Sequence, residues 1–108
     1  MTLQAKLEPI GTALAAIVQT TYHYWRPSKT TPFLIWAEDG ENGLEADDIK
    51  AEQAITGTAD YYTKSEFDAN VDSIQDCFNN LGLSWRLESV MYEEETGLIH
   101  YSWDWEAL

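Results

Sequence analysis

The sequence predicts an α+β fold, a two-layer sandwich in which a four-stranded antiparallel sheet carries two helices on one face. Two observations support this class. Apolar residues recur at alternating spacings of four and three residues over 3–17 and again over 67–81, which is the periodicity of an amphipathic helix. Each segment is followed by two β-rich runs, so the order is helix, hairpin, helix, hairpin. The 108 residues suffice for one domain, residues 1–108.

The first expected helix has an apolar stripe and a second apolar side. The stripe consists of Leu3, Leu7, Ile10, Leu14 and Ile17. Thr2 stands where an N-cap belongs, and Pro9 either kinks the helix or marks its first turn after a frayed start. Three alanines and Val18 supply the second apolar side. That surface is either buried against another chain or covered within the core, and both interpretations stay open.

The first expected hairpin follows an aromatic stretch, residues 20–25, and a loop bounded by Pro27 and Pro32. Residues 33–37 are typical of a short buried strand, and residues 38–43 of a turn rich in glycine and acids. We expect residues 49–63 to form one long strand that pairs back on 33–37. A helix over 44–53 remains the alternative. Gly57, inside the strand, indicates a bulge or a close backbone contact.

The second expected helix starts at a capping box, Ser65 to Asp68, and ends at Gly82. Its apolar stripe consists of Phe67, Val71, Ile74, Phe78 and Leu81. Cys77 borders this stripe and is interpreted as a small buried side chain rather than a nucleophile. Aspartates at 68, 72 and 76 are expected to line a solvated opposite face.

The second expected hairpin joins residues 83–92 to residues 98–106 through a polar turn at 93–97. Because strand side chains alternate, one face of the last strand carries its large apolar residues and should face the helices. These residues are Ile99, Tyr101, Trp103 and Trp105. The apolar phase of the preceding run changes between Leu87 and Val90, which predicts a bulge near residues 88–89.

The net charge of −13 is unevenly distributed. Residues 1–30 carry three basic residues against Glu8, a net of +2, whereas residues 31–108 carry 18 acids against three basic residues, a net of −15. Such a chain repels nucleic acid, so we expect no sequence-specific nucleic-acid binding. Cys77 is the single cysteine, which fits a reducing cytoplasm. The longest apolar run of the N-terminal helix is too short to span a membrane, and we expect no membrane association.

Signatures of catalysis are missing from the sequence. His23 and His100 have no cysteine, serine or acid at motif spacing, and no phosphate loop or cysteine-rich metal motif occurs. A calcium loop starting at Asp39 would place Lys50 where a glutamate ligand belongs. We therefore expect no enzymatic activity, no catalytic residue, no metal and no cofactor. The aromatic residues are better explained by core and interface packing than by base stacking, since a basic groove is lacking.

Three segments together resemble small structural proteins of tailed phages and prophages of Gram-positive bacteria. They are Tyr22-His-Tyr-Trp-Arg-Pro with Phe33-Leu-Ile-Trp-Ala-Glu; Ile55-Thr-Gly-Thr-Ala-Asp-Tyr-Tyr-Thr-Lys with Phe67-Asp; and Ser84-Trp-Arg-Leu with Tyr92-Glu-Glu-Glu-Thr-Gly-Leu-Ile-His-Tyr-Ser-Trp. The element order is similar to that of tail terminator (tail completion) proteins. In that family one α/β domain assembles as a hexameric ring that caps the tail tube and joins it to the head connector.

The resemblance implies a virion structural protein that assembles in the host cytoplasm and ends in the tail. Its expected partners are copies of itself, the tail tube and the head connector. A ring needs two different, complementary patches, which the basic N-terminal part and the acidic remainder can supply. The residues proposed for the subunit interface are Tyr24, Trp25, Arg26, Lys29, Glu93, Glu94 and Glu95. The alternative hypothesis is an acidic DNA mimic that inhibits a DNA-binding enzyme.

Overall fold

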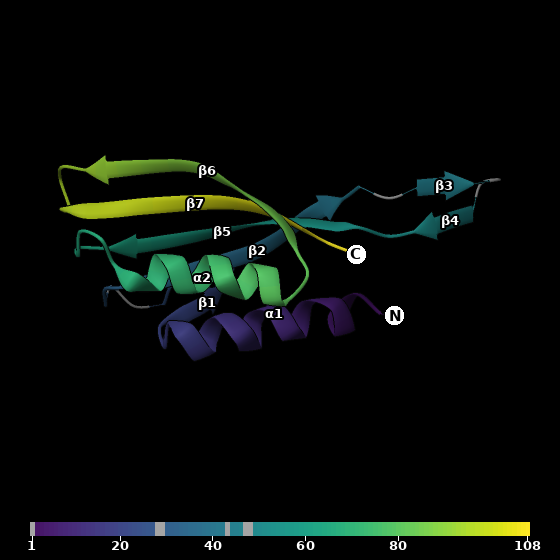
Figure 1. Ribbon diagram of the computed structural model, residues 1–108, viewed down its shortest axis with the longest axis horizontal. Helices are drawn as coiled ribbons and strands as arrows, with labels where there is room; N and C mark the ends of the chain where they lie inside the picture. The colour runs from purple at the N-terminus through teal and green to yellow at the C-terminus, as the bar shows by residue number, and fades with distance from the viewer. Residues whose placement is uncertain (1, 28–29, 43, 47–48) are drawn as a thin grey trace.

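Two helices lie on one face of an extended, twisted sheet (Figure 1). The computed structural model describes residues 2–27, 30–42, 44–46 and 49–108. The helices are α1 (Leu3–Ile17) and α2 (Ala69–Asn80), and the strands are β1 (Thr21–His23), β2 (Phe33–Glu41), β3 (Leu44–Ala46), β4 (Ile49–Glu52), β5 (Ile55–Thr63), β6 (Ser84–Glu93) and β7 (Leu98–Ala107). The predicted class and the helix layer agree with the structure, whereas the sheet differs in detail.

The main sheet has five strands in the order β1-β2-β5-β7-β6. The four strands β2, β5, β7 and β6 are antiparallel neighbours, as expected. The prediction of a four-stranded, purely antiparallel sheet was wrong because β1 adds a fifth, parallel strand beside β2. This strand comes from the aromatic stretch after α1, which is too short to show strand alternation in the sequence.

The first hairpin is longer than predicted. Residues 38–41 continue β2 instead of forming a turn, and Asp39 is accommodated as a bulge between Glu38 and Gly40. The single strand over 49–63 is divided into β4 and β5, and the alternative helix over 44–53 was wrong. β3 and β4 form a separate two-stranded ribbon that projects from one end of the sheet (Figure 1). The molecule is accordingly elongated, at 51 × 24 × 23 Å.

The first helix begins where the sequence predicted. The Thr2 hydroxyl accepts a hydrogen bond from the Ala5 amide at 3.1 Å, so Thr2 is the N-cap and the frayed start is excluded. Pro9 lies within the helix, and the helix continues past it to Ile17. Gly11 is packed against Trp36, whose ring would lie 2.7 Å from a Cβ atom at that position. A glycine here allows close contact between the helix and β2.

The second helix starts later than predicted, at Ala69. Its N-cap is Asp68 rather than Ser65, because the Asp68 carboxylate accepts a hydrogen bond from the Asn70 amide at 2.9 Å. Phe67 therefore lies outside the helix, is 92% exposed and has a φ of 56°, so its assignment to the apolar stripe was wrong. The predicted end at Gly82 is confirmed, since the Gly82 amide bonds to the Asn79 carbonyl with φ +73°.

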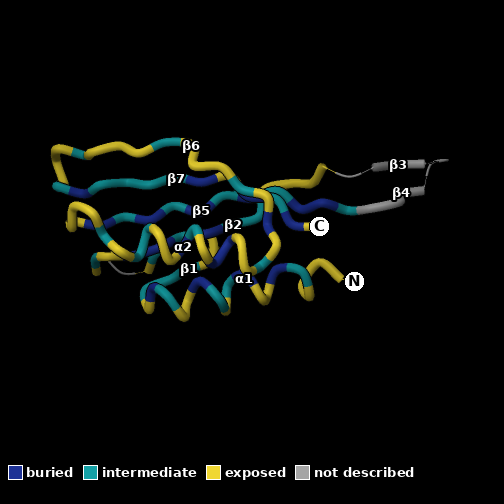
Figure 2. The backbone as a smooth tube through the Cα atoms, viewed as in Figure 1, coloured by how far each residue is buried: buried dark blue, intermediate teal, exposed yellow. Residues whose placement is uncertain are grey.

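The core lies between the helices and the middle strands of the sheet (Figure 2). Its largest fully buried side chains include Trp103, Tyr61 and Phe78. Trp103 and Trp105 are buried as predicted, and Cys77 is also buried. The predicted bulge in the second hairpin is confirmed at Glu88, between Leu87 and Ser89. The bulge returns Val90 to the face that carries Leu87, because Leu87 pairs with Trp103 and Val90 with Tyr101.

Candidate assembly surfaces

The predicted interface residues lie at two opposite edges of the sheet. Tyr24, Trp25 and Arg26 directly follow β1, which is one terminal strand. The glutamates at 93, 94 and 95 lie at the end of β6, the other terminal strand, and in the turn that follows it. Lys29 lies outside the described residues. Within one subunit the structure therefore separates the basic and acidic groups instead of pairing them.

The β1 edge carries a stacked aromatic cluster. The His23 ring stacks between Tyr24 and Trp36, with centroid separations of 4.0 Å to each. Glu38 accepts hydrogen bonds from the Tyr24 hydroxyl at 2.5 Å and pairs with His23 Nε2 at 2.6 Å. The hydrogen bond to Glu38 raises the pKa of Tyr24, so its hydroxyl stays a donor. Trp25, which follows, is 68% exposed and is not part of this stack.

The carboxylate of Glu38 is held in its charged form. Partial burial disfavours that form, but the hydrogen bonds from Tyr24 and His23 outweigh burial, and the pKa of Glu38 lies below its ordinary value. A groove of about 390 Å³ runs beside this cluster, between Trp36 and the first turns of α1. Its wall combines apolar residues of α1 with the Glu38 carboxylate. The cluster therefore combines stacked rings with a charged carboxylate at the β1 edge.

The face of the sheet opposite the helices, here called the open face, has a ladder of stacked rings. Phe33 stacks on Tyr62 at 4.5 Å, and Tyr62 stacks on His100 at 4.1 Å. The Arg26 guanidinium lies over the Phe33 ring, 3.9 Å from its centroid. Glu93 lies at the other end, with a carboxylate oxygen 4.0 Å from His100 Nδ1. The ladder crosses β2, β5 and β7 and places Arg26 and Glu93 on either side of it.

The pKa of Tyr62 responds to the charged residues around the ladder. Burial raises the pKa of Tyr62, and the charges of Asp60 and Glu93 raise it further, whereas Arg26 lowers it. His100 pairs with Asp60 through Nε2 at 2.7 Å. The contact between His100 and Tyr62 was not among the expectations from the sequence. Part of the signal was present, because Tyr62 and His100 each lie on the polar phase of an alternating strand, whereas Phe33 belongs to the apolar run 33–37.

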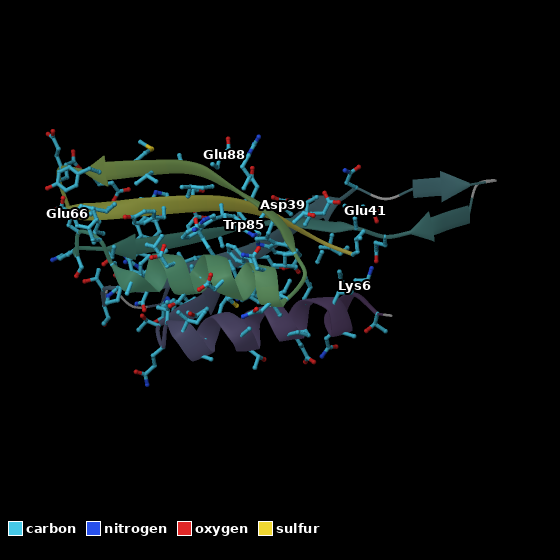
Figure 3. All side chains as sticks on the ribbon, in the orientation of Figure 1. Lys6, Asp39, Glu41, Glu66, Trp85 and Glu88 are labelled. Atoms are coloured by element: carbon cyan, nitrogen blue, oxygen red, sulfur yellow. The ribbon has the colours of Figure 1, made fainter. Side chains whose placement is uncertain are left out.

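The β6 edge exposes large apolar side chains that are not among the interface residues predicted from the sequence. Leu87, Val90, Met91 and Tyr92 are all exposed, and Tyr92 reaches 64%. On the helix side, α2 reaches β6 at Trp85, which packs on Phe78 and donates to the Asn79 side chain, whereas Leu87 and Val90 stay exposed. Met91 pairs with His100 and lies on the open face. In the described part of the chain, β6 pairs with β7 alone, so its outer backbone groups have no strand partner. The outward direction of Glu88 from β6 is visible in Figure 3.

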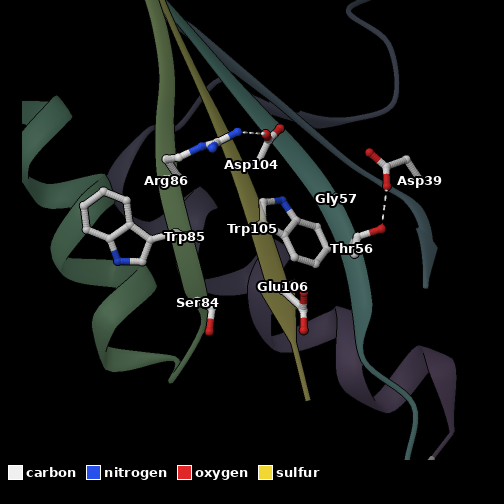
Figure 4. A pocket seen from close by; sticks show the side chains of 9 residues that line it. All are labelled: Asp39, Thr56, Gly57, Ser84, Trp85, Arg86, Asp104, Trp105 and Glu106. Carbon is white, nitrogen blue, oxygen red and sulfur yellow. Dashed lines mark hydrogen bonds and ion pairs between the residues drawn. The ribbon is translucent and has the colours of Figure 1, made fainter. Parts of the chain in front are cut away.

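A shallow groove of about 530 Å³ lies across the sheet between β2 and β6 (Figure 4). Arg86 contacts Glu88 at 2.5 Å and Asp104 at 3.6 Å within it. Partial burial raises the pKa of Asp104, and the hydrogen bond with Glu88 raises it further. Asp39 accepts a hydrogen bond from the Thr56 hydroxyl at 2.7 Å. These groups are paired with one another, and the groove brings together no nucleophile with a base.

Among the described residues, no group of three or more histidine, cysteine, aspartate or glutamate side chains is arranged to hold a metal ion. Neither helix in the described part of the chain combines the length and apolar character needed to cross a membrane. Cys77, on α2, is a free, buried cysteine, and burial raises the pKa of its thiol.

Comparison with known proteins shows what the fold is similar to. No protein family matches the sequence, and no curated protein matches it. Among solved structures, one similar chain belongs to the "virion of native gene transfer agent (GTA) particle". The likeness has a TM-score of 0.57 and spans 97% of this chain and 92% of that chain, with 16% sequence identity. The two chains therefore share a fold along nearly their whole length.

Proposed function

We propose that this protein is a structural component of a phage or prophage virion, with a role in assembly rather than in catalysis. Its fold matches that of a chain in a gene transfer agent virion over 97% of its length, and this observation carries the proposal. The resemblance of its aromatic and turn segments to phage structural proteins supports the same class independently of the fold.

Within that class, the proposed role is that of a tail terminator or head–tail joining protein, which forms a ring at the end of the tail tube. Two features support a ring. A cyclic assembly uses two different surface patches on each subunit, and the β1 and β6 edges are different from each other. One carries Arg26, and the other ends in a run of three glutamates. The −13 net charge also disfavours DNA sticking to the inner wall of such a ring.

The experiment that tests the role is deletion of the gene from a host that produces the particle. Loss of a terminator leaves tails of uncontrolled length and heads that remain unjoined, which electron microscopy detects. Complementation with the wild-type chain should restore tails of uniform length. Normal particles in the deletion strain would exclude both the terminator and the joining role. Mass spectrometry of purified wild-type particles separately tests whether the chain is a virion component.

The alternative, an acidic DNA mimic, rests on the net charge of −13 alone. A mimic requires carboxylates at spacings that imitate the phosphates of a duplex. Several carboxylates are instead paired within the chain, including Glu38 with His23 and Asp60 with His100. Co-purification distinguishes the two candidates, because a virion protein should recover tail or connector proteins, whereas a mimic should recover a nuclease or another DNA-binding enzyme.

A further inference from the structure

We propose that the subunits of the ring join by extension of the sheet, with β6 of one copy lying antiparallel to β1 of the next. This inference rests on the proposed function, since it supplies the contact that would close the ring. The occupant of each edge is a second copy of this chain.

The strand directions are compatible with continuation of the sheet. β1 runs parallel to β2, and the pairs β2–β5, β5–β7 and β7–β6 are each antiparallel. β6 therefore runs opposite to β1. If a second copy continues the sheet with its helices on the same side, its β1 meets the first copy's β6 as an antiparallel neighbour. The backbone groups on the outer side of β6 then gain partners.

The rows of side chains show which residues would meet. One row runs from Thr21 through Leu34, Tyr61 and Tyr101 to Val90. The next parallel row runs from His23 through Trp36, Ala59 and Trp103 to Leu87. When these rows continue into the next copy, Val90 lies beside Thr21 and Leu87 lies beside His23. Both rows belong to the face of the sheet that carries the helices.

The same alignment covers the exposed apolar surface. Tyr24 and Trp25 follow His23, and they are 57% and 68% exposed. Leu87 and Val90, which would lie opposite this edge, are 40% and 50% exposed. A soluble chain that exposes such residues at both ends of one sheet gains from burying the two edges against each other. Aromatic residues of this kind are favoured at the centres of protein interfaces.

The charges at the two edges are complementary. Arg26 lies over Phe33, at the start of β2, and Glu93 ends β6 at the corresponding end of the sheet. Phe33, Tyr62, His100 and Met91 share one row, so Glu93 is two residues beyond that row on the same face. In the extended sheet, the acidic end of β6 in one copy therefore approaches Arg26 of the next. A contact of two β6 edges would leave Tyr24 and Trp25 uncovered and could not close a ring.

Val90→Lys is the first test, with Phe67→Lys as its control. Both residues are exposed in the monomer, so neither change should unfold the chain. We expect Val90→Lys to weaken self-association at least roughly tenfold, because it places a charge in the apolar contact. Phe67→Lys should leave self-association unchanged. Analytical ultracentrifugation of the purified proteins measures both, and circular dichroism checks their folding. Equal association of wild type and Val90→Lys would overturn the inference.

Cysteine cross-linking tests the alignment. Under mild oxidation, the double variant Thr21→Cys, Val90→Cys should give a ladder of covalent multimers, and each single variant should remain monomeric in denaturing gels. The wild-type chain controls for Cys77. Covalent dimers from Val90→Cys alone would show that β6 meets β6 and would overturn the proposal, as would the absence of multimers from the double variant.

The result also separates this inference from the proposed function. If the virion contains the chain but Val90→Lys assembles normally, the contact surface is wrong and the function stands. If the purified chain forms the cross-linked ladder but is absent from virions, the contact stands and the function is wrong.

Discussion

Gly57 of β5 is paired with Trp105 of β7, whose indole ring points toward β5, as Figure 4 shows. A Cβ atom at position 57 would lie 2.1 Å from Trp105 Cζ2 and 2.4 Å from the Ala37 carbonyl oxygen. The Trp105 indole nitrogen donates to the Thr58 carbonyl at 2.9 Å, which fixes the ring over the glycine. The close contact expected at Gly57 from the sequence is therefore confirmed, and its partner is a core tryptophan.

Gly57→Ala should lower the free energy of unfolding by about 2–4 kcal/mol, because the added methyl group must displace Trp105 or the β2 backbone. Urea denaturation followed by tryptophan fluorescence measures the loss. Gly40→Ala is the matched control, since a Cβ atom there would meet only the Thr56 hydroxyl at 3.5 Å. Equal stability of the two variants would show that Trp105 does not pack on Gly57.

Tyr61→Phe should destabilise the chain by about 1–2 kcal/mol, because it removes a hydroxyl that donates to a half-buried carboxylate. The Tyr61 hydroxyl donates to Asp68 at 2.6 Å and accepts from the Asn70 side chain at 3.0 Å. Burial, followed by the contact with Asp68, raises the pKa of Tyr61 to about 12. Tyr101→Phe is the control, and it should be nearly neutral. A neutral effect of Tyr61→Phe would contradict the importance of this contact.

The stability contributed by Asp68 should disappear in acid. Burial opposes the charged carboxylate, but hydrogen bonds from Tyr61, the Asn70 amide and Thr63 outweigh it, so the pKa of Asp68 lies below its ordinary 3.8. A carboxyl whose pKa is lower in the folded chain stabilises it above the unfolded pKa. This stability is lost as the pH falls through the folded value.

Asp68→Asn should therefore reduce the free energy of unfolding at pH 7, and the difference from wild type should shrink below about pH 4. Denaturation at a series of pH values measures this trend. Asp72→Asn, at an exposed position on the same helix, controls for the loss of one negative charge. A difference between wild type and Asp68→Asn that stays constant down to pH 2 would contradict the assigned shift.

Phe67→Ala should change the free energy of unfolding by less than about 1 kcal/mol, because the ring is 92% exposed. Phe78→Ala, the same substitution at a fully buried site, should cost about 3–5 kcal/mol. Thermal or urea denaturation of the pair tests the corrected start of α2. A large loss from Phe67→Ala would restore Phe67 to the apolar stripe that the sequence predicted.

Sequence periodicity predicted the elements whose burial is one-sided and regular. The buried middle of the α1 stripe (Leu7, Ile10 and Leu14), the alternation of β7 and the bulge at Glu88 follow directly from it. Leu3, the first residue of the predicted stripe, is instead 47% exposed. The sequence patterns failed where a side-chain hydrogen bond or strand pairing decided the local structure. Phe67 continued a helical spacing, although the hydrogen bonds of Asp68 set the helix start. Residues 38–41 contained turn formers, but pairing with β5 kept them in the sheet.

The candidate surfaces were predicted in part. Charge asymmetry selected Arg26 and the glutamates at 93–95, which follow or end the two terminal strands of the sheet, and their role in a subunit interface stays a prediction. The apolar edge of β6 was missed, because exposure of Leu87 and Val90 depends on where the helix layer ends, and that is a property of tertiary packing. The ladder over Tyr62 similarly depends on the pairing of three strands that are distant in the sequence.

The measurement that most directly tests the account is the native mass of the purified protein over a range of concentrations, with and without tail tube protein. The account predicts a closed ring, and a hexamer of the 12.3 kDa chain would have a mass of about 74 kDa, six times the monomer. A closed ring should hold a fixed mass as concentration rises further. A strict monomer at every concentration, even with tube protein present, would contradict the proposed ring.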